Sequence, residues 1–540
     1  MPTSRSVVIG VDSSTQSTKA VAVDADTGEL LALGRAPHTV TGSAGARESD
    51  PEEWWTALVT AVRAAVRDAG VPADAVTGIA VAGQQHGLVT LGADGRPLRP
   101  ALLWNDTRSA PQAAALAARL GGPAAWLERT GSVPVASMTA AKWQWLRAHE
   151  PQHAAAVAGV RLPHDHLTER LAGVAVTDPG DASGTCWYGT AAGTYDHEDV
   201  TGASARRDLP GAHDGASGAH DSRSGDHDGT GPARAYDREI LDLIGLDPAL
   251  LPAVAPGGAT RVGTLTQAAA EALGLPRTVV VAAGTGDNMA AAVGLGLGGA
   301  GLLDHPVVSL GTSGTVFAAT HTRPADPGLA GFAATDGAYL PLGCTLNCTL
   351  AVDRFATLLG LDREDAAPGG GGGVVVLPYL DGERTPDLPH ASGLVTGLRH
   401  STDPRSVLGA AYEGAAFTVL RALDHLLAAC GLDPADPAVR DRPLRLIGGG
   451  ARGRAWTETV RRLSGRPLIV PAADELVALG AAALAAGAVT GADPVALTTA
   501  WGTGSGEVLP PVGRDEETWN RIEGVLAAAT PTLLSGPVAS

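Results

Sequence analysis

Two carboxylates of this chain stand where apolar, strand-like runs end. Asp12 closes the run VVIGVD, and a turn rich in hydroxyls and amides follows it at residues 13–16, with Lys19 just beyond. Asp287 lies in GTGDNMAAAVG, after a glycine-rich turn and at the expected start of a helix. A carboxylate placed there can accept the proton of a substrate hydroxyl during phosphoryl transfer to an alcohol, or it can simply cap the helix. Spacing alone leaves both interpretations open.

A second hairpin of the same kind lies in the other half of the chain. The stretch HPVVSLGTSGTVFAAT, residues 305–320, again predicts strand, Gly/Ser/Thr turn and strand. The turns at 13–16 and 311–314 offer backbone N–H groups and hydroxyls at close range, which is a nest for phosphate oxygens. Such turns are common singly. As a pair they predict a clamp on one polyphosphate and a duplicated architecture.

Three further stretches carry polar or glycine-rich patterns. AGQQHGLV (82–89) ends a strand in amides and a histidine, and LLWNDTR (102–108) adds an aromatic ring, an amide, a carboxylate and a guanidinium. That set is typical of a polyol site, although each residue singly is more often structural. LRLIGGGARGRAWTETVRRLSG (444–465) predicts strand, glycine turn and helix, and bare glycine lets a flat ring or a phosphate approach the backbone. Neither a P-loop nor a Rossmann fingerprint occurs in the right context.

The elements expected around these motifs alternate between strands and helices. SDPEEWW predicts a helix start, with Asp50 as cap, Pro51 in the first turn and Glu53 closing a capping box. Gly70 should end that helix, and VTGIAVAG (76–83) should follow as a buried strand. This alternation predicts α/β domains.

Composition narrows the class of protein. The chain has 540 residues, 44% of them hydrophobic, and a formal net charge of −18. Its length suggests three or four domains, or two large ones. An acidic chain repels nucleic acid and anionic membranes, so neither is an expected partner. Four cysteines in so long a chain do not form a disulfide framework. No signal peptide is recognised, and the apolar run at 476–489 is too short to span a bilayer, so we expect a cytoplasmic protein.

Two segments suggest the domain organisation. Residues 201–234 are rich in Gly, Ser, Asp and His, with His-Asp pairs beginning at 213, 220 and 227. We expect a disordered surface insertion there, with metal binding by the pairs as the alternative. The Pro/Gly-rich run at 250–263 reads as a linker, so the predicted domains are 1–257 and 258–540.

The motifs, taken in order along nearly the whole chain, resemble the FGGY family of carbohydrate kinases. They are GVDSSTQSTK, DPEEWW, GIAVAGQQHG, LRPALLWNDTR, GTGDNMAAAVG, SLGTSGTVFA, PYLDGERTP and LIGGGARGRAW. The Gln-Gln-His-Gly and Trp-Asn-Asp stretches are similar to those of the members that phosphorylate xylulose. Two positions depart from the family pattern: Ser14 replaces a glycine of the first turn, and Gln85 replaces a methionine, which can tune the choice of sugar.

The resemblance implies a fold, a reaction and a set of site residues. The fold is two ribonuclease-H-like α/β domains around a cleft, as in actin, hexokinase and Hsp70-type ATPases, with the sugar on the N-terminal domain and the nucleotide on the C-terminal one. The reaction is phosphorylation of D-xylulose by ATP and Mg²⁺, with Asp287 as the catalytic base and Asp12 helping to hold the metal. By matching position, the phosphates would lie against Ser13, Ser14, Thr15, Lys19, Gly311, Thr312 and Ser313, the adenosine against Gly449, Gly450 and Ala451, and the sugar against Gln85, His86, Trp104, Asp106, Asp287 and Asn288.

Alternatives remain at this stage. One is a sister kinase for ribulose, gluconate or glycerol. Another is an actin-like, non-metabolic ATPase that acts as a filament or chaperone, which would need the phosphate clamp without a sugar pocket. The expected partners are the sugar and ATP, and the family resemblance also suggests a homodimer.

Overall fold

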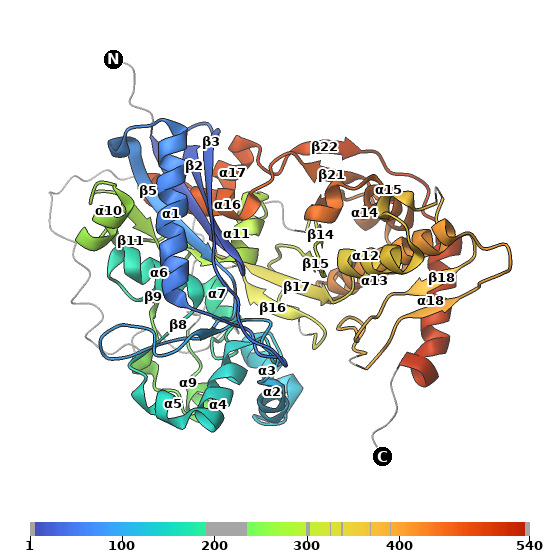
Figure 1. Cartoon of the computed structure of the whole chain (residues 1–540), viewed down its shortest axis with the longest axis horizontal. Coiled ribbons are helices and arrows are strands. Elements are labelled where there is room, and N and C mark those ends of the chain that lie inside the picture. The colour runs from blue at the N-terminus through green and yellow to red at the C-terminus, as the bar shows by residue number, and fades with distance from the viewer. Residues whose placement is uncertain are drawn as a thin grey trace, which may run out of the picture. The chain divides into compact units, whose positions relative to one another are not determined.

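The computed structural model of the chain describes residues 6–190, 235–298 and 303–534, except 325, 336, 337, 368 and 389. The insertion expected at 201–234 lies outside the described residues. The chain divides into two compact units, which share it in alternating segments (Figure 1). The first unit comprises Met1–Val293, Phe332–Gly337 and Val477–Trp501, and the second comprises Gly294–Gly331, Ala338–Leu476 and Gly502–Ser540.

The first unit is built on a mixed sheet with the strand order β3-β2-β1-β5-β12-β11. The pairs β3/β2 and β2/β1 are antiparallel, β1/β5 and β5/β12 are parallel, and β12/β11 is antiparallel. The short strand β13 also pairs with β5 in parallel. The strands are β1 (Val7–Ser13), β2 (Ser17–Asp24), β3 (Leu30–Pro37), β5 (Val76–Gly83), β11 (Arg261–Thr264), β12 (Val280–Ala282) and β13 (Thr285–Gly286).

The pairing of β11 and β12 carries the first unit past the predicted linker. We expected the first domain to end at residue 257, but the compact unit continues to Val293. Within the Pro/Gly-rich run, β10 (Ala253–Val254) pairs with β9 (Val176–Thr177). β11 begins in the same run and pairs with β12, which in turn pairs with β5. Backbone hydrogen bonds to distant strands therefore bind this run into the first unit.

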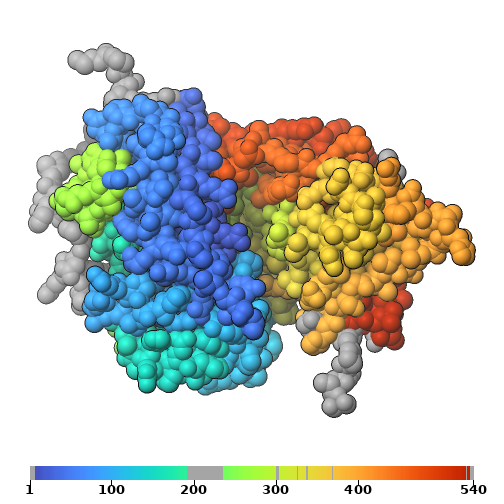
Figure 2. All heavy atoms as spheres, in the orientation of Figure 1, coloured from blue at the N-terminus to red at the C-terminus, as the bar shows by residue number. Residues whose placement is uncertain are grey.

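Helix α1 (Pro51–Ala69) covers one face of this sheet at β2 and β3, where its residues form part of the blue surface in Figure 2. Its predicted ends are confirmed, because the Asp50 side chain accepts a hydrogen bond from the backbone of the first turn and Gly70 ends the helix at a φ of 65°. The expected capping box is wrong, since the Glu53 carboxylate instead accepts a hydrogen bond of 2.7 Å from the backbone N–H of Thr39.

Helix α16 (Leu476–Thr490) is rich in small residues, which allow close packing. A Cβ atom added at Gly10 of β1 would lie 1.9 Å from the carbonyl oxygen of Ala478. Only glycine on the strand permits that approach. The other helices of the first unit are α2 (Ala110–Ala117), α3 (Pro123–Thr130), α4 (Thr139–His149), α5 (Pro151–Ala156), α6 (Pro163–Ala172), α7 (Pro179–Ser183), α9 (Arg238–Ile244), α10 (Gln267–Leu273) and α17 (Pro494–Trp501), and α11 (Asp287–Gly294) ends at the change of unit.

The second sheet has the strand order β16-β17-β15-β14-β20-β21-β22. From β17 onward its pairings repeat those of the first sheet, with two antiparallel pairs, two parallel pairs and a final antiparallel pair. This repeated order confirms the predicted duplicated α/β architecture. The strands are β14 (Val307–Leu310), β15 (Gly314–Phe317), β16 (Ala330–Ala333), β17 (Tyr339–Thr345), β20 (Leu444–Ile447), β21 (Leu468–Pro471) and β22 (Gly506–Leu509).

The core of the second unit is organised by the long helix α13 (Pro404–Ala429), which is buried along most of its length. Around it lie α12 (Thr349–Leu359), α14 (Pro437–Arg440), α15 (Arg454–Ser464) and α18 (Glu516–Ala529). Short two-stranded ladders complete the two units, formed by β4 (Glu48–Ser49) with β7 (Ala101–Leu102), β6 (Val89–Leu91) with β8 (Gly159–Arg161), and β18 (Val375–Leu377) with β19 (Leu394–Thr396).

Two further findings concern the described residues of both units. All four cysteines are free thiols, so they form no disulfide framework. A search of the helices in this part of the chain finds none with the length and apolar character needed to cross a membrane.

Candidate active site

Three strands of the first sheet end at one edge and bring the predicted residues together. β1 and β13 both pair in parallel with β5, so that Asp12 and Thr285 each lie opposite Ala82. Parallel strands have their carboxyl ends at the same edge of a sheet, where α/β proteins bind ligands. Asp12, the residues after β5, and Asp287 therefore gather at one edge, although they are far apart in the sequence.

Asp287 is the first residue of α11 and is partly buried. Its Oδ1 accepts hydrogen bonds from the backbone N–H of Asn288 at 2.8 Å and from the Asn288 amide at 3.3 Å. A capping side chain accepts from residues two or three positions further along, so neither bond is a capping bond. Burial, together with the negative charges of Asp12 and Asp181, raises the pKa of Asp287 to about 8. Such a carboxylate binds a proton tightly enough to serve as a general base.

Amide groups from two strand ends meet beside Asp287. The Asn288 side chain donates a hydrogen bond of 2.7 Å to Oε1 of Gln85. His86 follows with a φ of 65°, and its ring centroid lies 5.5 Å from that of Phe332 in the same unit. Amides and an imidazole beside a carboxylate are suited to binding several hydroxyl groups of one small polar ligand.

The turn after β1 is organised around Asp12. The Ser14 hydroxyl donates a hydrogen bond of 2.6 Å to Oδ1 of Asp12, while the Ser13 and Thr18 hydroxyls lie 3.3 Å apart. Lys19 lies directly opposite Asp12 in the β1/β2 register, so the two side chains share one face of the sheet. Nε1 of the half-exposed Trp104 donates 3.1 Å to the Thr15 hydroxyl, which brings the 102–108 loop to the turn.

Asp106 has a different environment from the other predicted sugar residues. Its buried carboxylate accepts hydrogen bonds from the backbone N–H of Arg47 and from the guanidinium of Arg108, which lies over the Trp145 ring. Burial alone would raise the pKa of Asp106, but these hydrogen bonds lower it below its usual value. The structure thus shows Asp106 holding its own loop together, and its contact with a sugar stays a prediction.

Two glycine-containing turns meet at one edge of the second sheet. β14 and β20 are parallel neighbours with Ser309 opposite Ile447, so the turn that follows β14 and the turn that follows β20 lie side by side. Thr349, the first residue of α12, donates from its hydroxyl to the carbonyl oxygen of Gly311 at 2.7 Å. Gly311, Thr312 and Ser313 are therefore held against the start of a helix, a favourable setting for anions.

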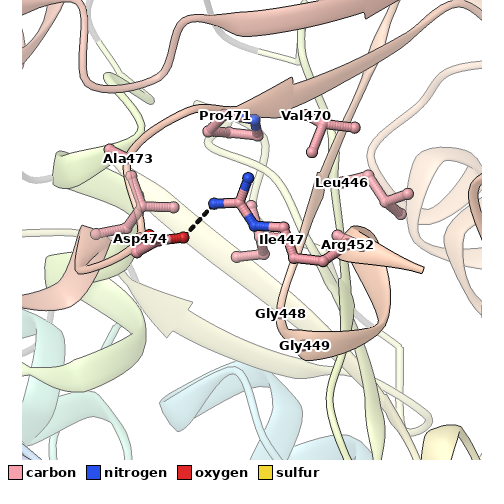
Figure 3. Close-up of a pocket in the computed structure, with 11 residues that line it drawn as sticks. Leu446, Ile447, Gly448, Gly449, Arg452, Val470, Pro471, Ala473 and Asp474 are labelled. Carbon is pink, nitrogen blue, oxygen red and sulfur yellow. Dashed lines mark hydrogen bonds and ion pairs between the residues drawn. The ribbon is translucent and has the colours of Figure 1, made fainter. Parts of the chain in front are cut away.

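A cavity of about 220 Å³ opens beside the second of these turns (Figure 3). Gly449 and Ala451 line it, whereas Gly450 is buried and a Cβ atom there would lie 2.7 Å from the Leu310 side chain. A Cβ atom at Gly449 would meet nothing within 4 Å, so the backbone is open to the cavity. Its lining is completed by Leu446, Ile447, Gly448, Arg452, Val470, Pro471, Ala473, Asp474 and Leu476, with Arg452 and Asp474 joined by an ion pair.

Comparison with known proteins agrees with this geometry. Residues 7–217 and 232–294 match the model of the N-terminal domain of the FGGY family of carbohydrate kinases, and residues 307–489 match the model of its C-terminal domain. The chain belongs to this family. Curated relatives include the xylulose kinase of Streptomyces rubiginosus, 53% identical over 98% of each chain, and that of Streptomyces coelicolor, 54% identical over 98% of this chain and 97% of the relative. The crystal structure of xylulose kinase from Bifidobacterium adolescentis is 30% identical, with a TM-score of 0.74 over 97% of this chain and 100% of that one.

The structure of this carbohydrate kinase also reveals buried ionisable residues that sequence reasoning missed. His164 of α6 lies between Asp165 and Asp181, at 3.2 Å and 2.6 Å. Asp178 accepts a hydrogen bond of 2.8 Å from the hydroxyl of Thr285, two residues before Asp287. The available signal was the density of His and Asp in PHDHLTERL (163–171) and TDPGDASG (177–184), but no local pattern shows that the two segments meet.

Proposed function

We propose that this kinase transfers the terminal phosphoryl group of ATP to D-xylulose and forms D-xylulose 5-phosphate. The identity of 53–54% with two xylulose kinases over nearly the full chain supports this choice of sugar. The observation that carries the chemistry is the carboxylate of Asp287, which lies beside the amide pair of Asn288 and Gln85 at the edge where β1, β5 and β13 end.

Asp287 acts as the general base in this proposal. It takes the proton of the terminal sugar hydroxyl as that oxygen attacks phosphorus and the bond to the leaving ADP breaks. Asn288, Gln85 and His86 hold other hydroxyl groups, and the half-exposed Trp104 ring offers an apolar face to the carbon chain. The raised pKa of Asp287 matches a base that must accept a proton from an alcohol and then release it.

Asp12 provides a carboxylate suited to Mg²⁺, since that ion prefers oxygen ligands. The Ser14 hydroxyl fixes the orientation of this carboxylate. Within the described residues there is no group of three or more His, Cys, Asp or Glu side chains that would form a protein-only metal site. This fits Mg²⁺, which commonly keeps several waters and is held by one or two carboxylates together with substrate phosphates. When bound, Mg²⁺ would neutralise negative charge on the phosphate oxygens.

The nucleotide residues of the second unit form their own set. The cavity beside Gly449 and Ala451 would hold the adenosine, and the turn Gly311–Ser313 would face phosphate oxygens. In the first unit, Ser13, Ser14, Thr15 and Lys19 would contribute hydroxyls, backbone N–H groups and a positive charge to phosphate binding.

A coupled ADP-release assay tests the proposal. D-xylulose, D-ribulose, gluconate and glycerol would be compared with Mg²⁺-ATP, using the wild-type chain and Asp287→Asn. We expect a strong preference for D-xylulose and a loss of turnover of about 10²- to 10⁴-fold in the variant, the range typical of a general base. Preference for another sugar would overturn the substrate, near-normal turnover of Asp287→Asn would overturn the base, and ADP release independent of every sugar would overturn the kinase reaction itself.

A further inference from the structure

A buried carboxylate that neither the family motifs nor the proposed mechanism uses lies next to the catalytic edge. Asp181 of α7 is fully buried, and its Oδ2 accepts a hydrogen bond of 2.6 Å from Nδ1 of His164. Its Oδ1 is buried too and has no hydrogen-bond partner among the described residues. A buried polar atom left without a partner is destabilising, and more so when it is charged, so a ligand that hydrogen-bonds to this oxygen would remove that cost.

The position of Asp181 is set by the backbone that leads to Asp287. Asp178 accepts hydrogen bonds from the backbone N–H groups of Gly180 and Asp181, at 3.1 and 3.0 Å, and from the hydroxyl of Thr285 at 2.8 Å. This carboxylate therefore ties α7 to β13. Since β13 ends at Gly286, the tie holds Asp181 beside the residue that precedes the catalytic base.

Gly286 separates Asp181 from the amide of Gln85. A Cβ atom built on Gly286 would lie 3.1 Å from Oδ1 of Asp181 and 3.1 Å from the amide carbon of Gln85. The carboxylate oxygen and the amide carbon are thus at most about 6.2 Å apart. Nε2 of Gln85 is likewise buried and without a partner in the described part of the chain, because the Asn288 bond uses only Oε1.

One hydroxyl group would satisfy both of these atoms. It would donate its hydrogen to Oδ1 of Asp181 and accept a hydrogen bond from Nε2 of Gln85, the two atoms that have no partner among the described residues. Two hydrogen bonds of about 2.8 Å through one oxygen would join Oδ1 of Asp181 to Nε2 of Gln85 across roughly 4.5–5.5 Å. The amide carbon that carries Nε2 lies at most about 6.2 Å from Oδ1, which allows such a span. We propose that Asp181 is a further substrate-binding residue, which with Gln85 holds a non-reacting hydroxyl of the sugar. The inference rests on the proposed function and deepens it.

His164 supplies the charge balance that this role requires. Burial alone would lower the pKa of His164, but the nearby carboxylates of Asp165 and Asp181 raise it to about 9. The imidazolium donates its Nδ1–H to Oδ2 of Asp181, and its Nε2 forms an ion pair with Asp165 at 3.2 Å, so the negative charge of Asp181 is compensated through Oδ2. The buried carboxylate can then keep one oxygen for a ligand without the full cost of an unpaired charge.

The experiment compares Asp181→Asn with a matched control, Asp165→Asn. Both changes remove one buried carboxylate from His164, but Asp165 lies on the other side of the ring and its second oxygen accepts from the backbone of Leu162. The KM and kcat of each variant would be measured with D-xylulose and its 1-, 3- and 4-deoxy derivatives. We expect Asp181→Asn to raise the KM for D-xylulose about 10- to 100-fold with little change in kcat, the loss typical of a hydrogen bond to a charged group. For one deoxy sugar, the wild type and Asp181→Asn should give equal KM values.

Three results would overturn the inference. If Asp181→Asn and Asp165→Asn raise the KM for D-xylulose equally, the cluster is only structural. If Asp181→Asn leaves this KM unchanged, or raises the KM equally for every deoxy sugar, no sugar hydroxyl contacts Asp181. If Asp181→Asn does not fold, Gln85→Leu serves in its place, because it removes the Nε2 donor to the same sugar hydroxyl. Gln85→Leu should then raise the KM for D-xylulose but match the wild-type KM with one of the deoxy sugars, and any other pattern would overturn the inference. Wild-type turnover with D-xylulose tests the proposed function separately, and its absence with every sugar would overturn both.

Discussion

Replacing Asp287 by Asn should stabilise the fold while it removes the activity. The folded protein raises the pKa of Asp287 from 3.8 to about 8, through burial and then through the charges of Asp12 and Asp181. Between these two pH values the folded state binds more protons than the unfolded state, so the free energy of unfolding falls as pH rises. That part of the stability is fully present below pH 3.8 and is lost once the pH exceeds 8.

The structure sets the size of the effect. A shift of about 4 pKa units corresponds to at most about 5–6 kcal/mol, at 1.36 kcal/mol per unit. Asp287 is only partly buried, so solvent screens its charge, and we expect about 2–3 kcal/mol. Asparagine cannot ionise and avoids this cost. The stability difference between Asp287→Asn and the wild type should therefore be near zero at pH 4 and grow to its full value by pH 9.

Thermal unfolding in EDTA between pH 4.5 and 9 measures this difference, with Asp26→Asn on the exposed surface of the same unit as the control. One kcal/mol corresponds to roughly 2–4 °C for domains of this size, so the variant should melt several degrees higher at pH 9. Asp26→Asn should show no such trend. A difference that stays constant with pH, or a wild type that gains stability over the variant as pH rises, would refute the reasoning. Given the proposed role of Asp287, its destabilising charge would be an exchange of stability for function.

Three further outcomes are expected. Gly449→Val should raise the KM for ATP about tenfold or more and leave the melting temperature unchanged, because its Cβ atom enters open space. Gly450→Val should instead lower the melting temperature, because its Cβ atom meets the Leu310 side chain. Equal effects of the two variants in ATP titrations and melting curves would contradict this. EDTA should abolish turnover and added Mg²⁺ should restore it. Asp12→Asn should need more Mg²⁺ than the wild type for half-maximal rate, and an equal Mg²⁺ requirement of the two proteins would exclude Asp12 from the metal site. Asp50→Ala should lower the unfolding free energy by about 1 kcal/mol without affecting the KM for either substrate, and denaturant titration with steady-state kinetics measures both.

Much of the local structure was predictable because its causes are local. Apolar runs around Ser/Thr/Gly turns predicted the hairpins β1/β2 and β14/β15, and the structure confirms both. Asp50 and Gly70 predicted the ends of α1, since capping depends on residues within one turn of the helix. The order of motifs along the chain was sufficient for the family, which the comparisons confirm.

Long-range pairings decided what the sequence left open. The Pro/Gly-rich run looked like a linker, yet backbone pairing with distant strands places it in the first unit. Asp106 accepts hydrogen bonds from the guanidinium of Arg108 and from the backbone of Arg47, and its predicted contact with the sugar stays a prediction. Arg108 is a local partner of Asp106, but the Arg47 backbone is 59 residues away in the sequence, and no local pattern predicts that contact.

The same distinction applies to the acidic residues around the site. The sequence alone predicted that Asp12 and Asp287 lie where strands end, because strand and turn preferences are set by neighbouring residues. That both residues lie at one edge beside β5, with His164, Asp178 and Asp181 buried nearby, follows from the packing of distant segments. The physical reason is that burial and charge coupling, which raise the pKa of Asp287, arise from the three-dimensional packing of segments far apart in the chain.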